Sequence, residues 1–150
     1  MDKMKTIQMQ FLLAMLLGVL VVVVMGYYTH TFNHDYFWLF RDWHFFVMSI
    51  LLQPIIEEIS FRGWIQGFLL GRDIGNHRWW LISSANVITT LLFGVIHLVY
   101  HTPIWAFLVT LPSLLYGYFR ERFDSVIPAI VLHIFYNLTY FSLLGMPSGV

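Results

Sequence analysis

The sequence predicts an all-α protein: a polytopic bundle of about five transmembrane helices in a single integral-membrane domain over residues 1–150. Composition is the first indication, because 59% of the residues are hydrophobic and 11% are charged, whereas soluble domains carry about 25% charged residues. The second is the recurrence of apolar runs long enough to cross a bilayer, separated by short polar loops. The formal net charge of zero argues against nucleic-acid partners, and the absence of cysteine excludes a disulfide framework and a thiolate nucleophile.

The apolar runs define the expected spans. The first, residues 11–28, is longer than the core of a cleavable signal peptide and lacks a small-residue cleavage site, so we expect a retained helix. The second, residues 44–70, exceeds the length that a bilayer requires, and Pro54 within it is expected to kink the helix and free a backbone carbonyl. The other three expected spans are residues 79–99, 104–119 and 126–144.

Positive charges predict the orientation of these spans in the membrane. With five spans, the N-terminus, the 71–78 loop and the 119–125 loop share one side of the bilayer. That side carries most of the basic residues, namely Lys3, Lys5, Arg72, Arg78, Arg120 and Arg122, whereas the opposite side carries Arg41. The positive-inside rule then places the N-terminus in the cytoplasm and the C-terminus outside it. The compact size is typical of a prokaryotic cell-membrane protein.

The second span carries three charged residues, Glu57, Glu58 and Arg62. A charge near the centre of a bilayer costs about 2.5–3.5 kcal/mol on insertion scales, so such residues are candidates for function. Glu58 and Arg62 are four residues apart and can pair on one helix face, which a purely structural ion pair would also explain. Glu57 is expected to point about 100° away from Glu58, on a different face of the helix. A carboxylate in such surroundings suits a general base near neutral pH.

Polar residues on two other spans are candidates for the same site: His97, His133 and Asn137. Each alone has an ordinary explanation as an interhelical hydrogen bond. Together they must face the bundle interior to avoid lipid, and a carboxylate meeting imidazoles and an amide is typical of a hydrolytic site. His97 and His101 have the H-x-x-x-H spacing of zinc helices, but Leu98 replaces the glutamate of that motif, which disfavours a classical zincin site.

Taken in order, these motifs resemble the signature of a known family. The segments are Glu57-Glu58-x-x-x-Arg62, Phe93-x-x-x-His97 and His133-x-x-x-Asn137. They are similar to the three motifs of the CPBP family, the CAAX prenyl endopeptidases and bacteriocin-processing membrane proteases also called Abi proteins. The resemblance covers about residues 45 to 140. It implies an all-helical intramembrane endopeptidase that acts in the lipid bilayer on a membrane-tethered peptide or protein substrate.

The resemblance also implies a role for each motif residue. Glu57 would activate a water molecule, and His97 would position or polarise it. His133 and Asn137 would stabilise the oxyanion of the tetrahedral intermediate. Glu58, held by its arginine partner, would orient the site. Many family members have six to eight spans, whereas five are expected here.

Two alternatives remain open at this point. Glu57, His97 and His133 could hold a divalent metal such as zinc, although the Asn137 amide fits an oxyanion donor better and favours the metal-free glutamate mechanism. No cofactor is otherwise implied. The chain could also be a catalytically silent immunity or scaffold protein of the same family. An ion translocator is less well supported, because the sequence shows no internal pseudo-symmetry. Prenylated peptides, bacteriocin leaders and C-terminal sorting signals are all compatible substrates.

Overall fold

Helices dominate the computed structural model, which describes residues 3–35 and 37–145. The prediction of an all-α protein is therefore confirmed. The chain forms two compact units, the first comprising Met1–Pro54 and Leu132–Val150 and the second Ile55–Val131. The expectation of a single domain over residues 1–150 stays a prediction, and each unit is described separately below.

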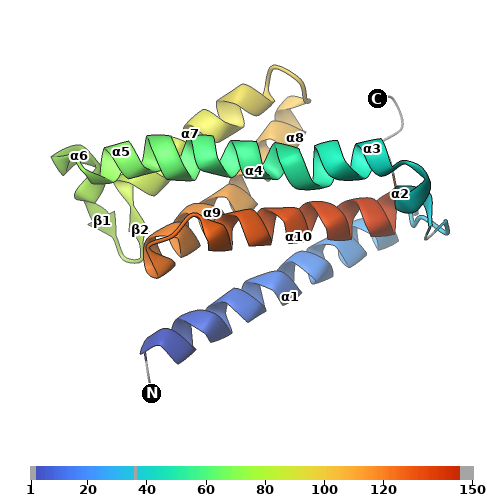
Figure 1. Cartoon of the computed structure of the whole chain (residues 1–150), viewed down its shortest axis with the longest axis horizontal. Helices are drawn as coiled ribbons and strands as arrows, with labels where there is room; N and C mark the ends of the chain where they lie inside the picture. The colour runs from blue at the N-terminus through green and yellow to red at the C-terminus, as the bar shows by residue number, and fades with distance from the viewer. Residues whose placement is uncertain (1–2, 36, 146–150) are drawn as a thin grey trace. The chain divides into compact units, whose positions relative to one another are not determined.

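Within the described residues, three helices are long and apolar enough to cross a membrane by length and composition. They are α1 (Lys3–Thr29), the continuous helix Trp43–Leu70 and α10 (Ile127–Leu144). Figure 1 shows the second of these as one long rod that runs from α3 through α4 to α5. They correspond to the first, second and fifth spans expected from the sequence.

The rod winds through alternating α-helical and π-helical segments: α3 (Trp43–Phe45), η1 (Phe46–Leu52), α4 (Gln53–Glu58), η2 (Ile59–Ile65) and α5 (Gln66–Leu70). A π-helix bonds residue i to residue i+5, so it turns less per residue than an α-helix. Mixing the two keeps residues spaced four apart on one line of the helix. Five such residues are all buried: Ile50, Pro54, Glu58, Arg62 and Gln66. The π-helical segments therefore keep the ion pair and Gln66 on a common face.

The third expected span begins later than the sequence suggests, so the prediction of a helix from residue 79 is wrong. Arg78–Trp79 (β1) and Ile82–Ser83 (β2) instead form an antiparallel pair after the short helix α6 (Asp73–Asn76). Helix α7 (Ser84–His97) starts where the Ser83 side chain accepts a hydrogen bond from the Asn86 N–H, a typical N-cap. Its 14 residues extend about 21 Å, short of the ~30 Å hydrocarbon core.

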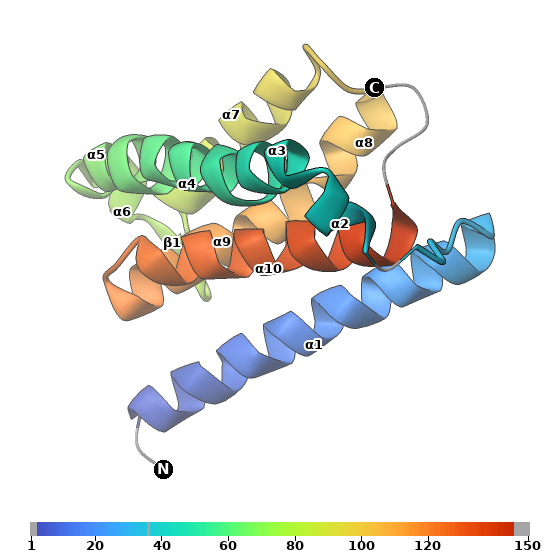
Figure 2. The same cartoon turned by 45° about the vertical axis from the view of Figure 1, so that its right-hand side comes forward.

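The fourth expected span, residues 104–119, is divided into α8 (Pro103–Leu108) and α9 (Thr110–Phe123). Figure 2 shows them as two separate helices. Pro112 explains the break, because it has no N–H for the carbonyl four residues earlier and its ring clashes there. Asp124 follows and caps α9: it adopts a left-handed conformation, and its N–H donates to the Arg120 carbonyl.

In the first unit, α10 organises the packing. The Tyr136 hydroxyl donates to the Ala14 carbonyl of α1 at 2.7 Å, and the Tyr136 ring occupies the space that a side chain at Gly18 would need. The indole N–H of Trp38, in the short helix α2 (Trp38–Arg41), donates to the Phe141 carbonyl at 3.1 Å. These contacts hold α1 and α2 against α10, which carries His133 and Asn137.

Candidate functional site

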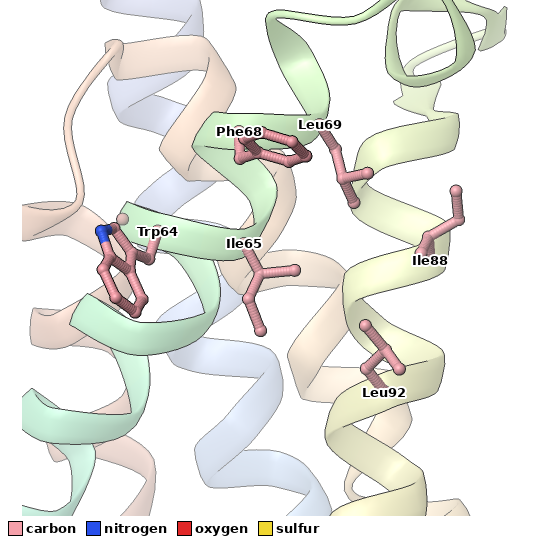
Figure 3. Close-up of a pocket in the computed structure, with 7 residues that line it drawn as sticks. Trp64, Ile65, Phe68, Leu69, Ile88 and Leu92 are labelled. Carbon is pink, nitrogen blue, oxygen red and sulfur yellow. The ribbon is translucent and has the colours of Figure 1, made fainter.

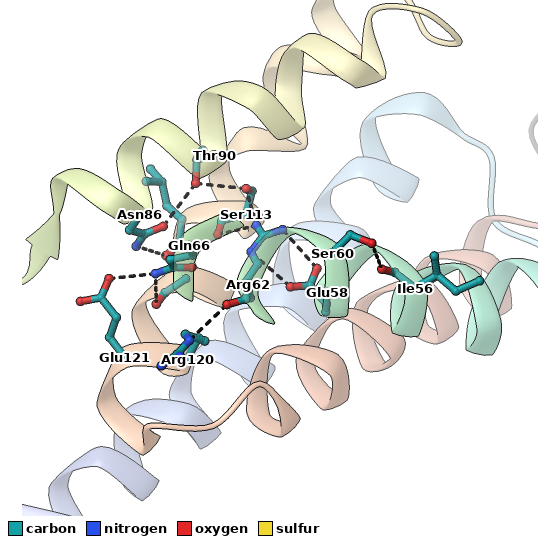
Figure 4. Close-up of polar contacts among 12 residues, drawn as sticks. Ile56, Glu58, Ser60, Arg62, Gln66, Asn86, Thr90, Ser113, Arg120 and Glu121 are labelled. Atoms are coloured by element: carbon teal, nitrogen blue, oxygen red, sulfur yellow. Dashed lines mark hydrogen bonds and ion pairs between the residues drawn. The ribbon is translucent and has the colours of Figure 1, made fainter. Parts of the chain in front are cut away.

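The predicted ion pair forms in the second unit and is fully buried. The Arg62 Nε lies 3.2 Å from the Glu58 Oε2, and neither side chain is exposed. The Arg62 guanidinium also donates to the Ser113 carbonyl of α9 at 3.0 Å and to the Ser113 hydroxyl. Figure 4 shows Arg62 between Glu58 and Ser113. Glu58 is thus paired with an arginine whose guanidinium is also hydrogen-bonded to Ser113 of α9.

Aromatic rings enclose the Arg62 guanidinium. Its Cζ lies 4.8 Å from the ring centroid of Phe93, 5.4 Å from that of Tyr116 and 5.9 Å from that of Phe61. Cation–π attraction is stronger when the cation is removed from water, as it is here. The rings and the carboxylate together compensate the arginine for lost hydration.

A second cluster of hydrogen bonds continues from the ion pair toward the β-hairpin. The Gln66 amide donates to the Gly117 carbonyl at 3.1 Å and to the Glu121 carboxylate at 2.8 Å. Glu121 also accepts from the Ser83 hydroxyl and pairs with Arg78 at 2.8 Å. Figure 4 shows Gln66 and Glu121 on this side of Arg62. These bonds tie α5, the hairpin and α9 together behind the ion pair.

Helices α7 and α9 approach each other closely in the same network. The Asn86 amide donates to the Leu114 carbonyl at 3.0 Å, and a Cβ at Gly117 would lie 2.0 Å from the Asn86 Oδ1. The Ser113 hydroxyl donates to Thr90 at 3.1 Å. The rigid contact between α7 and α9 therefore supports both Arg62 and the helix that carries His97.

His97 lies at the C-terminal end of α7, one turn after Phe93. Its Nδ1 donates to the Phe93 carbonyl at 2.8 Å, because a carbonyl can only accept. The proton therefore resides on Nδ1 in the neutral ring, and Nε2 is left as an acceptor. His97 is half-buried, so its side chain is not sealed inside the helix bundle.

Glu57 lies in the same unit and is half-buried, in contrast to the buried Glu58. Burial lowers the pKa of His101, the neighbouring His97 lowers it further, and the Glu57 carboxylate raises it. Glu57 therefore lies within electrostatic range of His101, just beyond the end of α7. The structure brings Glu57, Glu58, Arg62 and His97 into one unit.

His133 and Asn137 belong to the first unit. His133 is buried, and the Asn137 Nδ2 donates to the Ser49 carbonyl at 3.1 Å. In η1 the Gln53 N–H bonds the Met48 carbonyl, five residues earlier. The same pattern would pair Ser49 with residue 54, but Pro54 has no N–H. Asn137 thus satisfies the carbonyl that the proline leaves free, and its meeting with Glu57 stays a prediction.

The sequence patterns single out none of four residues that support the ion pair, namely Ser113, Thr90, Gln66 and Glu121. The sequence does contain a pattern that could have identified Gln66. Glu58, Arg62 and Gln66 are each four residues apart, so Gln66 is expected on the same helix face as the ion pair. Ser113 and Thr90 offered no such pattern, since each is an ordinary polar residue of an apolar helix.

Within either unit, the described residues contain no three histidine, aspartate or glutamate side chains placed to share a metal ion. Glu57 and His97 are of types that zinc accepts, and they are in one unit. The proposed third ligand, His133, is in the other. The metal set Glu57, His97 and His133 therefore stays a prediction.

An apolar groove of about 550 Å³ lies beside the network in the second unit. In Figure 3, Ile65 and Leu69 project from the helix of Glu58 toward Ile88 and Leu92 of α7. The lining is completed by Gly63, Trp64 and Phe68. No side chain in this lining is charged, so the groove can hold apolar groups but cannot perform hydrolysis.

Comparison with known proteins gives one family. A family model described as "Type II CAAX prenyl endopeptidase Rce1-like" matches residues 38–139. The match includes every motif residue of the candidate site: Glu57, Glu58, Arg62, His97, His133 and Asn137. No curated protein and no solved structure matches the chain.

Proposed function

Because the chain belongs to the Rce1-like family of type II CAAX prenyl endopeptidases, we propose that it is an intramembrane endopeptidase that cleaves a membrane-associated peptide. The observation that carries the proposal is the family match over 38–139, which contains all three polar motifs in order. The family description makes a prenylated C-terminal peptide the first substrate to test. Bacteriocin leaders and C-terminal sorting signals are the comparison substrates.

The two adjacent glutamates have different roles in this proposal. Glu58 is fully buried against Arg62, so its carboxylate cannot reach a substrate without breaking the ion pair. Glu57 is half-buried and within electrostatic range of His101, the neighbour of His97. Glu57 is therefore the general base. It takes a proton from water as the oxygen attacks the scissile carbonyl, and it later returns that proton to the leaving amine.

His97 and the α10 residues complete the proposed mechanism. With its proton on Nδ1, His97 accepts a hydrogen bond at Nε2 from the attacking water and so orients it. His133 and Asn137 stabilise the oxyanion. One N–H of the Asn137 amide is used on the Ser49 carbonyl, and the second is the one assigned to the oxyanion. The mechanism requires the polar face of α10 to meet Glu57.

A metal-dependent version uses the same residues. Glu57, His97 and His133 would hold the ion, which when bound would polarise the scissile carbonyl. We favour the metal-free version because the Asn137 amide can supply the oxyanion donor that a metal would replace. The two versions differ in one measurable way, since only the metal-dependent enzyme loses activity on chelation.

The test replaces Glu57→Gln, which keeps the shape of the side chain and removes the base. Purified protein in lipid vesicles is mixed with a prenylated membrane-tethered peptide, and cleavage is followed by mass spectrometry. We expect the rate to fall by about 10²–10⁴-fold, the usual contribution of a general base. The matched control is Asp73→Asn, a carboxylate-to-amide change at an exposed position on α6.

The outcomes separate the alternatives. Undiminished cleavage by the Glu57→Gln protein would contradict the assignment of the base. Unchanged cleavage by the native chain after dialysis against a chelator supports the metal-free version. A native chain that cleaves none of the three substrate classes would instead favour the catalytically silent family member.

A further inference from the structure

Three aromatic rings form a column along the C-terminal end of α7. Phe93, His97 and His101 are spaced four residues apart, so they lie one above another on one helix face. The Phe93 and His97 ring centroids are 4.3 Å apart with an interplanar angle of 34°. The His97 and His101 centroids are 5.6 Å apart with an angle of 19°. His97 is thus covered by an aromatic ring on each face.

The helical backbone continues past the end of α7 to keep His101 in this column. The Leu98 N–H donates to the Gly94 carbonyl at 3.2 Å, and the His101 N–H donates to the His97 carbonyl at 2.9 Å. Helix α8 starts at Pro103, directly after the Thr102 N-cap. The chain therefore turns away only after it has placed His101 over His97.

The inner end of the column rests on the buried ion pair. The Arg62 guanidinium lies over the Phe93 ring at 4.8 Å, and Phe61 packs edge-on against Phe93 at 5.0 Å. Phe93 is 2% exposed, whereas His101 is exposed. The column is consequently held firmly at Phe93, which packs against Arg62 and Phe61. At its other end, the exposed ring of His101 covers His97.

We propose that His101 is a positioning residue for His97: its ring covers the outer face of His97 and fixes the direction of the Nε2 atom. The terminal torsion of a histidine is broad, so the Phe93 hydrogen bond and one ring face leave the imidazole free to tilt. Stacking of His101 on the other face removes that freedom. The inference rests on the proposed function, in which Nε2 orients the attacking water.

The kinetic test compares His101→Ala with His101→Phe on the peptide substrate. Alanine removes the ring, whereas phenylalanine keeps a flat ring and removes both nitrogens. We expect His101→Ala to lower kcat about tenfold, the effect of losing one ordinary aromatic contact, and to leave KM nearly unchanged. His101→Phe should restore most of kcat. Tyr100→Ala is the control, since it removes a ring that is 81% exposed from the same turn.

A second measurement reports on His97 without turnover. In protein labelled with ¹⁵N-histidine, the His97 ring signals are assigned by their loss in His97→Gln, and their shifts show which nitrogen carries the proton. We expect His101→Ala to broaden or shift these signals and His101→Phe to restore them. If the native chain cleaves no substrate, the proposed function fails while this measurement still tests the positioning role.

The results that overturn the inference are specific. One is a His101→Ala protein with native kcat and native His97 signals, which would mean that the outer ring does not position His97. The other is a His101→Phe protein as impaired as His101→Ala, which would mean that a nitrogen of His101 is needed instead of its flat ring.

Discussion

Glu57 and Glu58 show how a single step along a helix separates two functions. Glu58 lies on the buried line of the rod and is neutralised by Arg62, whose guanidinium is also held by Ser113 and the Phe93 ring. Glu57 lies about 100° away around the helix and is half-buried. Removing one partner of a buried ion pair leaves an uncompensated buried charge. The loss of folding stability is therefore larger than when a solvent-exposed ion pair is broken.

A prediction at this scale concerns the stability of the ion pair. Glu58→Gln should lower the free energy of unfolding by about 3–5 kcal/mol, because Arg62 would remain buried without its counter-charge. Thermal unfolding in detergent, followed by circular dichroism, measures the change. The double variant Glu58→Gln/Arg62→Met should recover much of the loss, since no unpaired charge remains. A Glu58→Gln protein of native stability would show that the pair contributes nothing to folding.

At the scale of elements, the mixed winding of the rod from Trp43 to Leu70 decides which residues share a face. Its π-helical segments keep positions spaced four apart on one line, so the ion pair and Gln66 contact α9 together. Pro54 follows the first of these segments and leaves the Ser49 carbonyl to the Asn137 amide. Asn137 of α10 is thereby bonded to the part of the rod that belongs to the first unit.

This contact predicts a coupling between Pro54 and Asn137. Asn137→Ala alone should cost about 1–3 kcal/mol of stability, because the Ser49 carbonyl loses its donor. In a Pro54→Ala background the new backbone N–H can serve that carbonyl, so the same change should cost less. A double-mutant cycle by chemical unfolding measures the difference, expected at about 0.5–3 kcal/mol. Strict additivity of the two changes would contradict the explanation of why Asn137 bonds Ser49.

At the scale of the whole molecule, the chain is an integral membrane protein of a protease family, with three helices long and apolar enough to span. Its basic residues predict an orientation in the membrane. The basic residues Arg72, Arg78, Arg120 and Arg122 lie in the loops and helix ends expected on the cytoplasmic side. Two of them also have internal partners, since Arg78 pairs with Glu121 and Arg120 with Asp124.

The orientation can be tested directly because the native chain has no cysteine. Single cysteines are introduced at two exposed positions, His34→Cys and Asn76→Cys. A membrane-impermeant thiol reagent added to intact cells should label residue 34 and should reach residue 76 only after the membrane is permeabilised. The reverse pattern would mean that the N-terminus lies outside the cytoplasm. Labelling of both positions in intact cells would contradict the expected number of crossings between them.

Part of the fold and site follows from local rules alone. The long apolar runs predict α1, the Trp43–Leu70 rod and α10. Whether a segment can span a membrane as a helix depends on its own length and hydropathy, and not on its packing partners. The pairing of Glu58 with Arg62 follows from their spacing of four residues. The bounds of α7, α8 and α9 were less predictable. A serine N-cap at Ser83 and a proline at position 112 interrupt apolar runs that hydropathy treats as continuous.

The sequence by itself determined the helical class, the three helices long and apolar enough to span a membrane, the order of the polar motifs and the ion pair within one helix. Only the tertiary structure decided which residues surround the ion pair, Asn137 and His97. Ser113 and Tyr116 come from a helix about fifty residues away, Asn137 bonds Ser49 across 88 residues, and His97 gains a ring on each face. The physical reason is that helix formation and i,i+4 pairing are local, whereas a buried polar group takes the partner that packing brings within reach.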